Sequence, residues 1–284
     1  MRLLRHGRSG AEKPGLLDAE GRIRDLSGHI DDITPALLAN GRLSRLAGLD
    51  PASLPRVEGQ PRLGPPLAGV PNLVCIGLNY ADHARETNSP IPEAPIVFMK
   101  HTGSIIGPND QVRIPRGASK TDWEVELGVV IGRRASYVDE ADAMAHVAGY
   151  CIVNDVSERD FQFHGGGNQW IKGKSPDTFA PIGPWLVTKD EIPDPQNLAM
   201  WLEVDGHRYQ DGSTKTMIFG VRHLVHYISQ FMSLQPGDVI STGTPPGVGM
   251  GIKPNPIWLK PNQTMRLGID GLGEQQQRTV AYAG

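Results

Sequence analysis

The sequence predicts an α+β fold that is mostly β, and three observations support this prediction. The 284 residues include 34 glycines and 24 prolines, a density of helix-breaking residues that favours a strand-rich, turn-rich fold over a helical bundle. Apolar residues alternate with polar ones or form short β-branched runs, as in residues 122–132 and 147–153. The length allows a substantial core in one large domain, with room for a second, small one.

Residues 1–66 read as a small N-terminal domain, followed by a larger domain over residues 67–284. Residues 15–26 have the pattern of two short strands joined by a polar turn. Thr34 and Pro35 are typical of the N-cap and first position of a short helix. Prolines punctuate residues 51–66 as in a linker, and no residue of this domain suggests chemistry.

The larger domain is expected to consist mainly of strands. A hairpin is predicted over residues 198–210, with Asp205 and Gly206 as its two-residue turn. Residues 139–144 start a helix, and residues 220–232 have helical spacing with one apolar face. Residues 161–173 are expected to form a loop centred on three glycines, either a hinge for a lid or an ordinary turn. Further strands are predicted over residues 72–77, 95–100, 122–132, 147–153 and 178–187.

Composition excludes several classes of function. The net charge of −3, the pI near 6.3 and the absence of a basic run argue against a nucleic-acid partner. No apolar run approaches the ~18 residues of a membrane span. No secretory signal is visible, because no apolar core follows the charged residues 1–8. Cys75 and Cys151 lie in apolar strand-like runs and read as buried thiols, so we expect a cytoplasmic protein.

Two glutamates on one predicted strand indicate a metal site. Side chains two apart on a strand share a face, ~7 Å apart, so Glu124 and Glu126 lie side by side. In a pocket their repulsion would need a positive partner, which a hard divalent cation with oxygen ligands supplies. Asp155 follows the apolar run 147–153 and could bring a third carboxylate from a neighbouring strand. The alternative is a solvated strand face, the usual meaning of Glu-x-Glu.

His83 and Glu86 form a candidate general-base pair. On a helix they share a face, being three residues apart. A carboxylate beside an imidazole raises its basicity and fixes its tautomer, which suits a base that acts on water. The alternative is an ordinary helix-surface pair. No Gly-x-Ser-x-Gly elbow competes with this interpretation, and neither cysteine has the surroundings of a nucleophile. Lys100 could reach a pocket, but a surface position is the expectation for a lysine.

Several motifs in order give the chain a family resemblance over about residues 71–271. The chain resembles the fumarylacetoacetate hydrolase family, and the ordered set is more specific than any single member. The motifs are Gly77-Leu78-Asn79-Tyr80-Ala81-Asp82-His83, Glu124-Val125-Glu126-Leu127, Asn154-Asp155-Val156-Ser157-Glu158-Arg159-Asp160, Lys174-Ser175 and Thr242-Gly243-Thr244-Pro245.

The resemblance implies a mixed β-roll catalytic domain with a smaller N-terminal domain, usually as a homodimer. It also implies Mg²⁺, or sometimes Mn²⁺ or Ca²⁺, held by Glu124, Glu126 and Asp155. The remaining matches are His83 and Glu86 as the water-activating pair, Lys174 as the lysine beside the metal, and Arg159, Gln162 and Thr244 as substrate-binding residues.

The leading hypothesis is Mg²⁺-dependent hydrolysis of a C–C bond in a 2,4-dioxo acid. The substrate would be an acylpyruvate or a 2,4-diketo-3-deoxy sugar acid, and the products pyruvate and a second carboxylic acid. Residues 14–18 and 165–170 look most like those of bacterial members assigned to sugar-acid breakdown or labelled ureidoglycolate lyase.

Three alternatives stay open, because the fold alone does not decide the reaction. The first is decarboxylation of oxaloacetate or a related acid, which needs enolate stabilisation but no water. Another is cleavage of ureidoglycolate on the same metal site. A different class is a small-molecule binding protein without chemistry, against which the intact His83, Glu86 and Lys174 argue.

Overall fold

The computed structural model describes residues 1–39, 43–164 and 168–283. The three glycines predicted to centre a loop, residues 165–167, lie outside the described residues. Among the described residues, no helix has both the length and the apolar character that a membrane crossing requires. The α-helices are α1 (Pro35–Ala39), α2 (Leu43–Leu46), α3 (Ala81–Glu86), α4 (Arg159–Phe163), α5 (Trp170–Lys174) and α6 (Val221–Ser229).

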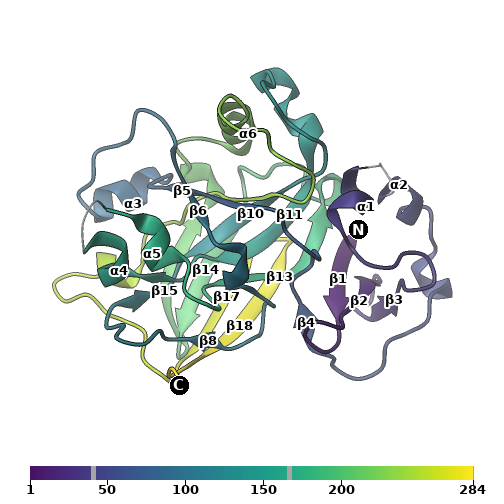
Figure 1. Cartoon of the computed structure of the whole chain (residues 1–284), viewed down its shortest axis with the longest axis horizontal. Coiled ribbons are helices and arrows are strands. Elements are labelled where there is room, and N and C mark those ends of the chain that lie inside the picture. Colours follow the sequence, from purple (N-terminus) through teal and green to yellow (C-terminus); the bar gives the residue numbers. More distant parts are fainter. Residues whose placement is uncertain (40–42, 165–167, 284) are drawn as a thin grey trace.

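The largest sheet runs through both predicted domains. Its order is β3-β2-β1-β13-β11-β10-β16-β5-β6, with β4 added at β1 and β7 at β13. Strand β1 pairs antiparallel with β13, so the N-terminal strands continue the sheet of the larger part, as Figure 1 shows. The division between residues 66 and 67 stays a prediction. The strands are β1 (Arg2–His6), β2 (Lys13–Leu17), β3 (Ile23–Asp25), β4 (Leu63–Gly64), β5 (Leu73–Gly77), β6 (Ile96–Lys100), β7 (Ile105–Ile106), β10 (Val125–Ile131), β11 (Val147–Asn154), β13 (Ala180–Thr188) and β16 (Val239–Ser241).

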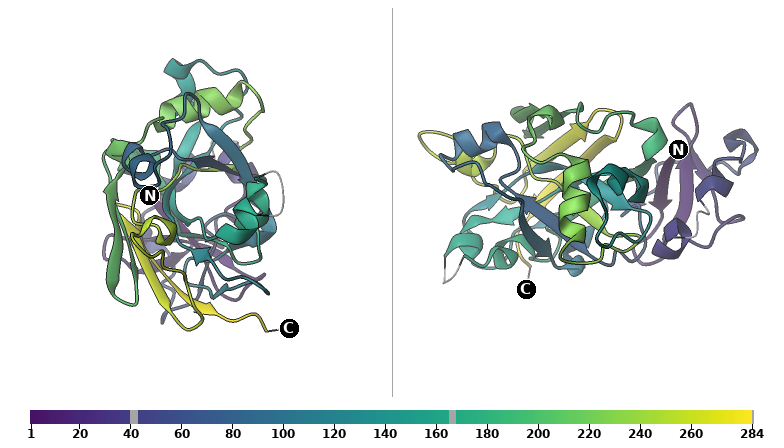
Figure 2. Two further views of the ribbon diagram at one scale, coloured as in Figure 1. Left: turned by 90° about the vertical axis from the view of Figure 1, so that its left-hand side faces the viewer. Right: turned by 90° about the horizontal axis from the view of Figure 1, so that it is seen from above.

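A second sheet packs against the first and closes the roll. Its order is β15-β14-β17-β18-β8, and the left view of Figure 2 shows the sheets curving around a shared interior. Leu127 and Val129 of β10 belong to one buried cluster with Met200 and Leu202 of β14. The mostly β, α+β prediction is thereby confirmed. The strands are β8 (Val112–Arg113), β14 (Ala199–Val204), β15 (His207–Ser213), β17 (Thr264–Ile269) and β18 (Gly273–Val280), while β9 (Thr121–Asp122) and β12 (Ser157–Glu158) form a separate pair.

Local sequence signals predicted several elements correctly. The hairpins over 15–26 and 198–210 are present, and Asp205 and Gly206 turn the second with φ of 49° and 82°. The predicted helix in 220–232 is α6, which buries most of the apolar face expected from its spacing. Phe231 and Met232 of that face lie beyond the end of the helix and are exposed. The helical start at 139–144 is a 3₁₀ helix over Glu140–His146.

The loop predicted for residues 161–173 is partly wrong, because α4 and α5 occupy most of its described residues. Their stability comes from tertiary packing that local propensity does not show. Gly173 allows the close approach of the two helices, since a Cβ at this position would lie 2.5 Å from the Glu158 carbonyl oxygen. Figure 1 shows α3, α4 and α5 gathered at the end of the roll opposite β1–β3.

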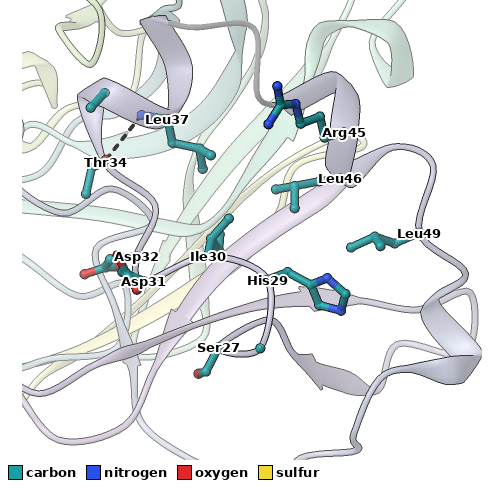
Figure 3. Close-up of a pocket in the computed structure, with 12 residues that line it drawn as sticks. Ser27, His29, Ile30, Asp31, Asp32, Thr34, Leu37, Arg45, Leu46 and Leu49 are labelled. Atoms are coloured by element: carbon teal, nitrogen blue, oxygen red, sulfur yellow. Dashed lines mark hydrogen bonds between the residues drawn. The ribbon is translucent and has the colours of Figure 1, made fainter.

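The N-terminal part has its own apolar cluster beside the sheet. Thr34 accepts a hydrogen bond from the Leu37 backbone N–H (3.3 Å), as expected of an N-cap. Ile30, Leu37 and Leu46 point toward one another around a hollow of about 730 Å³ (Figure 3). This hollow lies in the domain where the sequence shows no candidate chemistry.

Candidate active site

Three buried carboxylates meet where β10 and β11 pair. Val125 faces Asn154 in this pairing, and the Asp155 N–H donates to the Glu124 carbonyl oxygen (2.9 Å). Ligand oxygens of Glu124, Glu126 and Asp155 all lie within 4.8 Å of one another. The three residues are at most 6% exposed, which excludes the solvated face considered above. Among the described residues, this is the one group of three acidic, His or Cys side chains placed to hold a metal.

Glu126 is the least compensated member of the cluster. Its Oε2 accepts hydrogen bonds from the Ser241 hydroxyl (2.6 Å) and the Gly243 backbone N–H (3.0 Å), both at the end of β16. Burial, followed by the charges of Asp155 and Glu124, raises the pKa of Glu126 well above its ordinary value. Because repulsion from Asp155 and Glu124 helps to raise this pKa, a cation bound beside Glu126 would favour its ionised form.

Lys174 bridges two of the carboxylates. Its ammonium donates to Glu124 Oε2 (2.6 Å) and Asp155 Oδ2 (2.7 Å) from the last turn of α5. Burial alone would lower the pKa of Lys174, but Asp155 and Glu124 hold it above its ordinary value. For Glu124 burial acts in the opposite direction and would raise the pKa. The charges of Lys174 and Arg159 outweigh burial and lower the pKa of Glu124 to about 2.

Lys100 is a buried partner of the cluster, so its expected surface position is wrong. It ends β6 at 1% exposure and donates to Asp155 Oδ1 and to the Val156 carbonyl oxygen (2.9 Å). Burial lowers the pKa of Lys100, and Asp155 opposes this shift. Lysine side chains are usually exposed to solvent, and only the pairing of β6 with β5 shows that the Lys100 side chain lies inside the roll.

Arg159 is buried in ion pairs. Its guanidinium donates to Asp122 Oδ2 (2.9 and 2.7 Å), to Glu124 Oε1 (2.7 Å) and to the Gln162 amide oxygen (3.0 Å). Asp122 also accepts from the backbone N–H groups of Gly249 (2.6 Å) and Met250 (3.1 Å). Sequence reasoning gave Asp122 no role, although its spacing of two from Glu124 was the signal that could have found it.

The His83–Glu86 pair faces the site from α3. His83 Nδ1 lies 3.1 Å from Glu86 Oε2, and Glu86 Oε1 accepts from the Gly247 backbone N–H (2.9 Å). His83 is only 6% exposed, so the pair is not an ordinary helix-surface pair. Glu86, fixed by Gly247, orients the imidazole with its Nε2 available.

One pocket of about 130 Å³ brings the predicted site residues together. Thr244 lines this pocket, but its hydroxyl is already used within the protein. The hydroxyl donates to the Val125 carbonyl oxygen (2.9 Å) and accepts from Gln210 (2.8 Å). Glu86 lies behind His83 and is the one predicted residue outside the lining. The predicted residues in the lining are His83, Glu124, Glu126, Asp155, Arg159, Gln162, Lys174 and Thr244.

The donor set fits a hard divalent cation. Glu124, Glu126 and Asp155 offer only oxygen ligands, as Mg²⁺, Mn²⁺ and Ca²⁺ prefer. Four carboxylates, counting Asp122, face the three cations Lys100, Arg159 and Lys174, which leaves one negative charge if all are ionised. The raised pKa of Glu126 expresses the same imbalance.

Comparison with known proteins identifies the family. The model of the fumarylacetoacetate (FAA) hydrolase C-terminal family matches residues 72–280. The chain belongs to the fumarylacetoacetate hydrolase family. A protein of Burkholderia cenocepacia (strain HI2424) is 63% identical over 279 residues, which cover 98% of this chain and 99% of that protein. Its name gives a hydrolase without a substrate.

Solved structures of the family share the whole fold. Fumarylacetoacetate hydrolase from Exiguobacterium antarcticum has a TM-score of 0.89 at 34% identity, covering 99% of this chain and 100% of that one. A probable 2-hydroxyhepta-2,4-diene-1,7-dioate isomerase from Mycobacterium abscessus has a TM-score of 0.85 at 30% identity, with both chains fully covered. Maleylpyruvate hydrolase from Sphingobium sp. SYK-6, in complex with manganese(II) and pyruvate, has a TM-score of 0.81 at 26% identity, again with full coverage. A hydrolase or isomerase-type activity is therefore supported for this family member.

Replacing Glu126 with glutamine is expected to weaken Mg²⁺ binding by at least about tenfold, because one of three anionic ligands is lost. Isothermal titration calorimetry with MgCl₂ measures the effect. The matched control is Glu274→Gln, which removes an exposed carboxylate paired with Arg266 and should bind like the wild type. Wild-type affinity in Glu126→Gln would contradict the proposed ligand set.

The pKa of Glu126 also predicts a pH dependence without metal. A folded-state pKa above the ordinary 4.5 means that the folded protein holds this proton more tightly than the unfolded chain does. The resulting stabilisation is present below about pH 4.5 and is lost as the pH rises toward the folded pKa. Urea unfolding in EDTA should therefore show Glu126→Gln gaining stability relative to wild type between about pH 5 and pH 7. A pH-independent difference would exclude the raised pKa.

Proposed function

We propose that this protein hydrolyses the C3–C4 bond of a 2,4-dioxo acid, giving pyruvate and a second carboxylic acid. The observation that carries the proposal is the single pocket that holds His83, oriented by Glu86, beside the carboxylate cluster and Lys174. A base for water and a site for a developing enolate are the two requirements of this reaction. The hydrolase and pyruvate complex among the structural relatives are consistent with it.

Glu124, Glu126 and Asp155 would hold the divalent cation, for which we propose Mg²⁺. When bound, the ion would polarise the 2-oxo group and stabilise negative charge on the departing enolate. The chain's own residues account for binding, orientation and proton transfer.

His83 supplies the base. Glu86 accepts the Nδ1 hydrogen, so Nε2 keeps its lone pair and takes a proton from a water molecule. The water oxygen bonds to C4, the C3–C4 bond breaks, and its electron pair passes to pyruvate as an enolate. The proton taken up by His83 returns to C3 and completes pyruvate.

Lys174 stabilises the enolate. Two of its three ammonium hydrogens are used by Glu124 and Asp155, which leaves one N–H for the substrate oxygen. We propose that Gln162 and Thr244 position the substrate from the pocket wall, with Arg159 acting from within its ion pairs.

A product analysis by NMR tests the proposal. Acylpyruvates are incubated with the protein and Mg²⁺, and EDTA is the control. Pyruvate with a second carboxylic acid, formed only with metal, supports the proposal. Turnover of oxaloacetate to pyruvate and carbon dioxide, with every acylpyruvate intact, would replace it with a decarboxylase. Cleavage of ureidoglycolate alone would keep the metal site and change the substrate.

Isomerisation is a second candidate, favoured by the isomerase among the structural relatives. His83 could move a proton between carbons of a 2-hydroxydienoate without attack by water. The same spectra separate this reaction, because an isomerase leaves the carbon skeleton whole.

We further propose that the chain acts as a homodimer in the cytoplasm, as its family membership favours. Exposed apolar side chains support a contact surface near α6, where Tyr137 is 77% and Phe231 70% exposed. Light scattering coupled to size-exclusion chromatography should give twice the mass of one chain.

A further inference from the structure

The pocket has a second wall, which the proposed chemistry does not use. Phe98, Phe163 and Trp170 form it, and they line the same pocket as the carboxylates. The ring centroids of Phe98 and Trp170 lie 5.3 Å apart, and those of Phe163 and Trp170 lie 6.2 Å apart, in edge-to-face arrangements. The aromatic wall defined by these three residues begins beside the cluster, since Lys174 Nζ lies 5.4 Å from the Phe98 ring centroid.

The position of Trp170 depends on Gly77. A Cβ on Gly77 would lie 2.3 Å from Cζ3 of Trp170, so the indole occupies the space that a larger residue would take. Trp170 comes from α5, the helix that also carries Lys174. Trp170 of the aromatic wall and the enolate-stabilising lysine are therefore positioned by one short helix.

No spare cation faces this wall among the described residues that line the pocket. The two lining cations, Arg159 and Lys174, are both paired with buried carboxylates, and the remaining ammonium hydrogen of Lys174 is the one proposed for the enolate oxygen. A second carboxylate on the substrate would lose its hydration against aromatic rings without gaining a partner. The carboxylates that line the pocket, and Glu86 behind His83, would also repel a second negative charge on the substrate.

We propose that the site selects monoanionic 2,4-dioxo acids whose acyl group is short, neutral and apolar, and that the aromatic wall binds this group. This inference rests on the proposed function for the identity of the substrate. It disfavours dicarboxylic and polyhydroxylated substrates. The pocket volume of about 130 Å³ favours a compact acyl chain.

Two ligands that are not cleaved test the inference independently of turnover. 2-Oxopentanoate and 2-oxoglutarate have similar size, but one ends in a methyl group and the other in a carboxylate. Calorimetry in Mg²⁺ should show at least about tenfold tighter binding of 2-oxopentanoate. It should also bind about tenfold tighter than pyruvate, since each buried CH₂ contributes roughly a factor of four. Equal or tighter binding of 2-oxoglutarate, or no binding of either ligand, would overturn the inference.

Substitutions in the aromatic wall test whether these residues cause the tighter binding of 2-oxopentanoate. Trp170→Ala should lose most of the advantage of 2-oxopentanoate over pyruvate while pyruvate still binds. Phe163→Ala should act in the same direction and serves if Trp170→Ala does not fold. Ile171→Ala is the matched control, because Ile171 is the next residue on α5, is 48% exposed and does not line the pocket. An unchanged advantage in both wall variants would show that the aromatic wall does not bind the acyl group.

Turnover separates this inference from the proposed function. 2,4-Dioxoheptanoate should be cleaved with at least about tenfold higher kcat/KM than 2,4-dioxoheptanedioate, which carries a carboxylate in place of the terminal methyl. Preference for the dioate would overturn the inference and leave C–C hydrolysis standing. Failure to cleave either compound would overturn the proposed function, while the binding comparison would still decide the inference.

Discussion

Replacing His83 with alanine is expected to reduce kcat for acylpyruvate hydrolysis by about 10²–10⁴-fold, the usual contribution of a general base. Nε2 is lost as the acceptor of the water proton, and Glu86 keeps only its contact with the Gly247 N–H. Mg²⁺ affinity should be retained, because His83 is not a proposed ligand. Steady-state kinetics with calorimetry on the same sample measures both quantities.

The matched control is His223→Ala. His223 also faces a glutamate, with Nδ1 3.3 Å from Glu140 Oε2, but it lies outside the pocket. Its replacement should leave kcat within about twofold of wild type. Any decarboxylation of oxaloacetate should fall less in His83→Ala than hydrolysis does, because that reaction needs no activated water. Hydrolysis within tenfold of wild type in His83→Ala would remove this residue from the mechanism.

The largest loss of stability is expected from Lys100→Met. This change removes a cation from a fully buried pair and leaves Asp155 with Lys174 alone, at a cost of about 3–5 kcal/mol. Urea unfolding measured in EDTA gives the change in free energy. Added Mg²⁺ should recover part of the loss, because a cation at Asp155 replaces the missing positive charge.

Lys120→Met is the control for this variant. Lys120 also pairs with one aspartate, Asp160 (2.8 Å), but its side chain is 41% exposed. Exposed pairs contribute below about 1 kcal/mol, so this variant should unfold close to wild type. Equal free energies of unfolding for the two lysine variants would show that burial does not increase the contribution of the Lys100–Asp155 pair to stability.

The sequence predicted the acidic part of the site because strands have a strict period. Glu124 and Glu126 are two residues apart at the start of β10, and Asp155 directly follows the neighbouring strand β11, so their meeting follows from pairing β10 with β11. The His83–Glu86 pair was predictable in the same way from helical spacing. In each case a local geometric rule fixes which side chains share a face.

The burial of Lys100, the two short helices and the aromatic wall depend on contacts between distant parts of the chain, which local sequence patterns do not predict. Lys100 is buried because β6 ends beside Asp155, 55 residues away in the chain. Residues 159–163 and 170–174 have little helical signal of their own and are helical because they pack on each other and on the pocket. The aromatic wall was missed for the same reason, since Phe98 and Trp170 come from separate elements and meet only in the folded chain.

The hydrogen bonds at Glu126 have a consequence for biosynthesis. Its partners Ser241 and Gly243 follow it by 115 and 117 residues, and Ser241 ends β16, the strand that joins β10 to β5. On the ribosome, Glu126 therefore emerges long before the groups that orient its carboxylate. A nascent chain that ends before residue 241 lacks both hydrogen-bond donors to Glu126. Loop closure over such separations is slow. Binding of the proposed metal is therefore expected only after residues 241–243 have been translated.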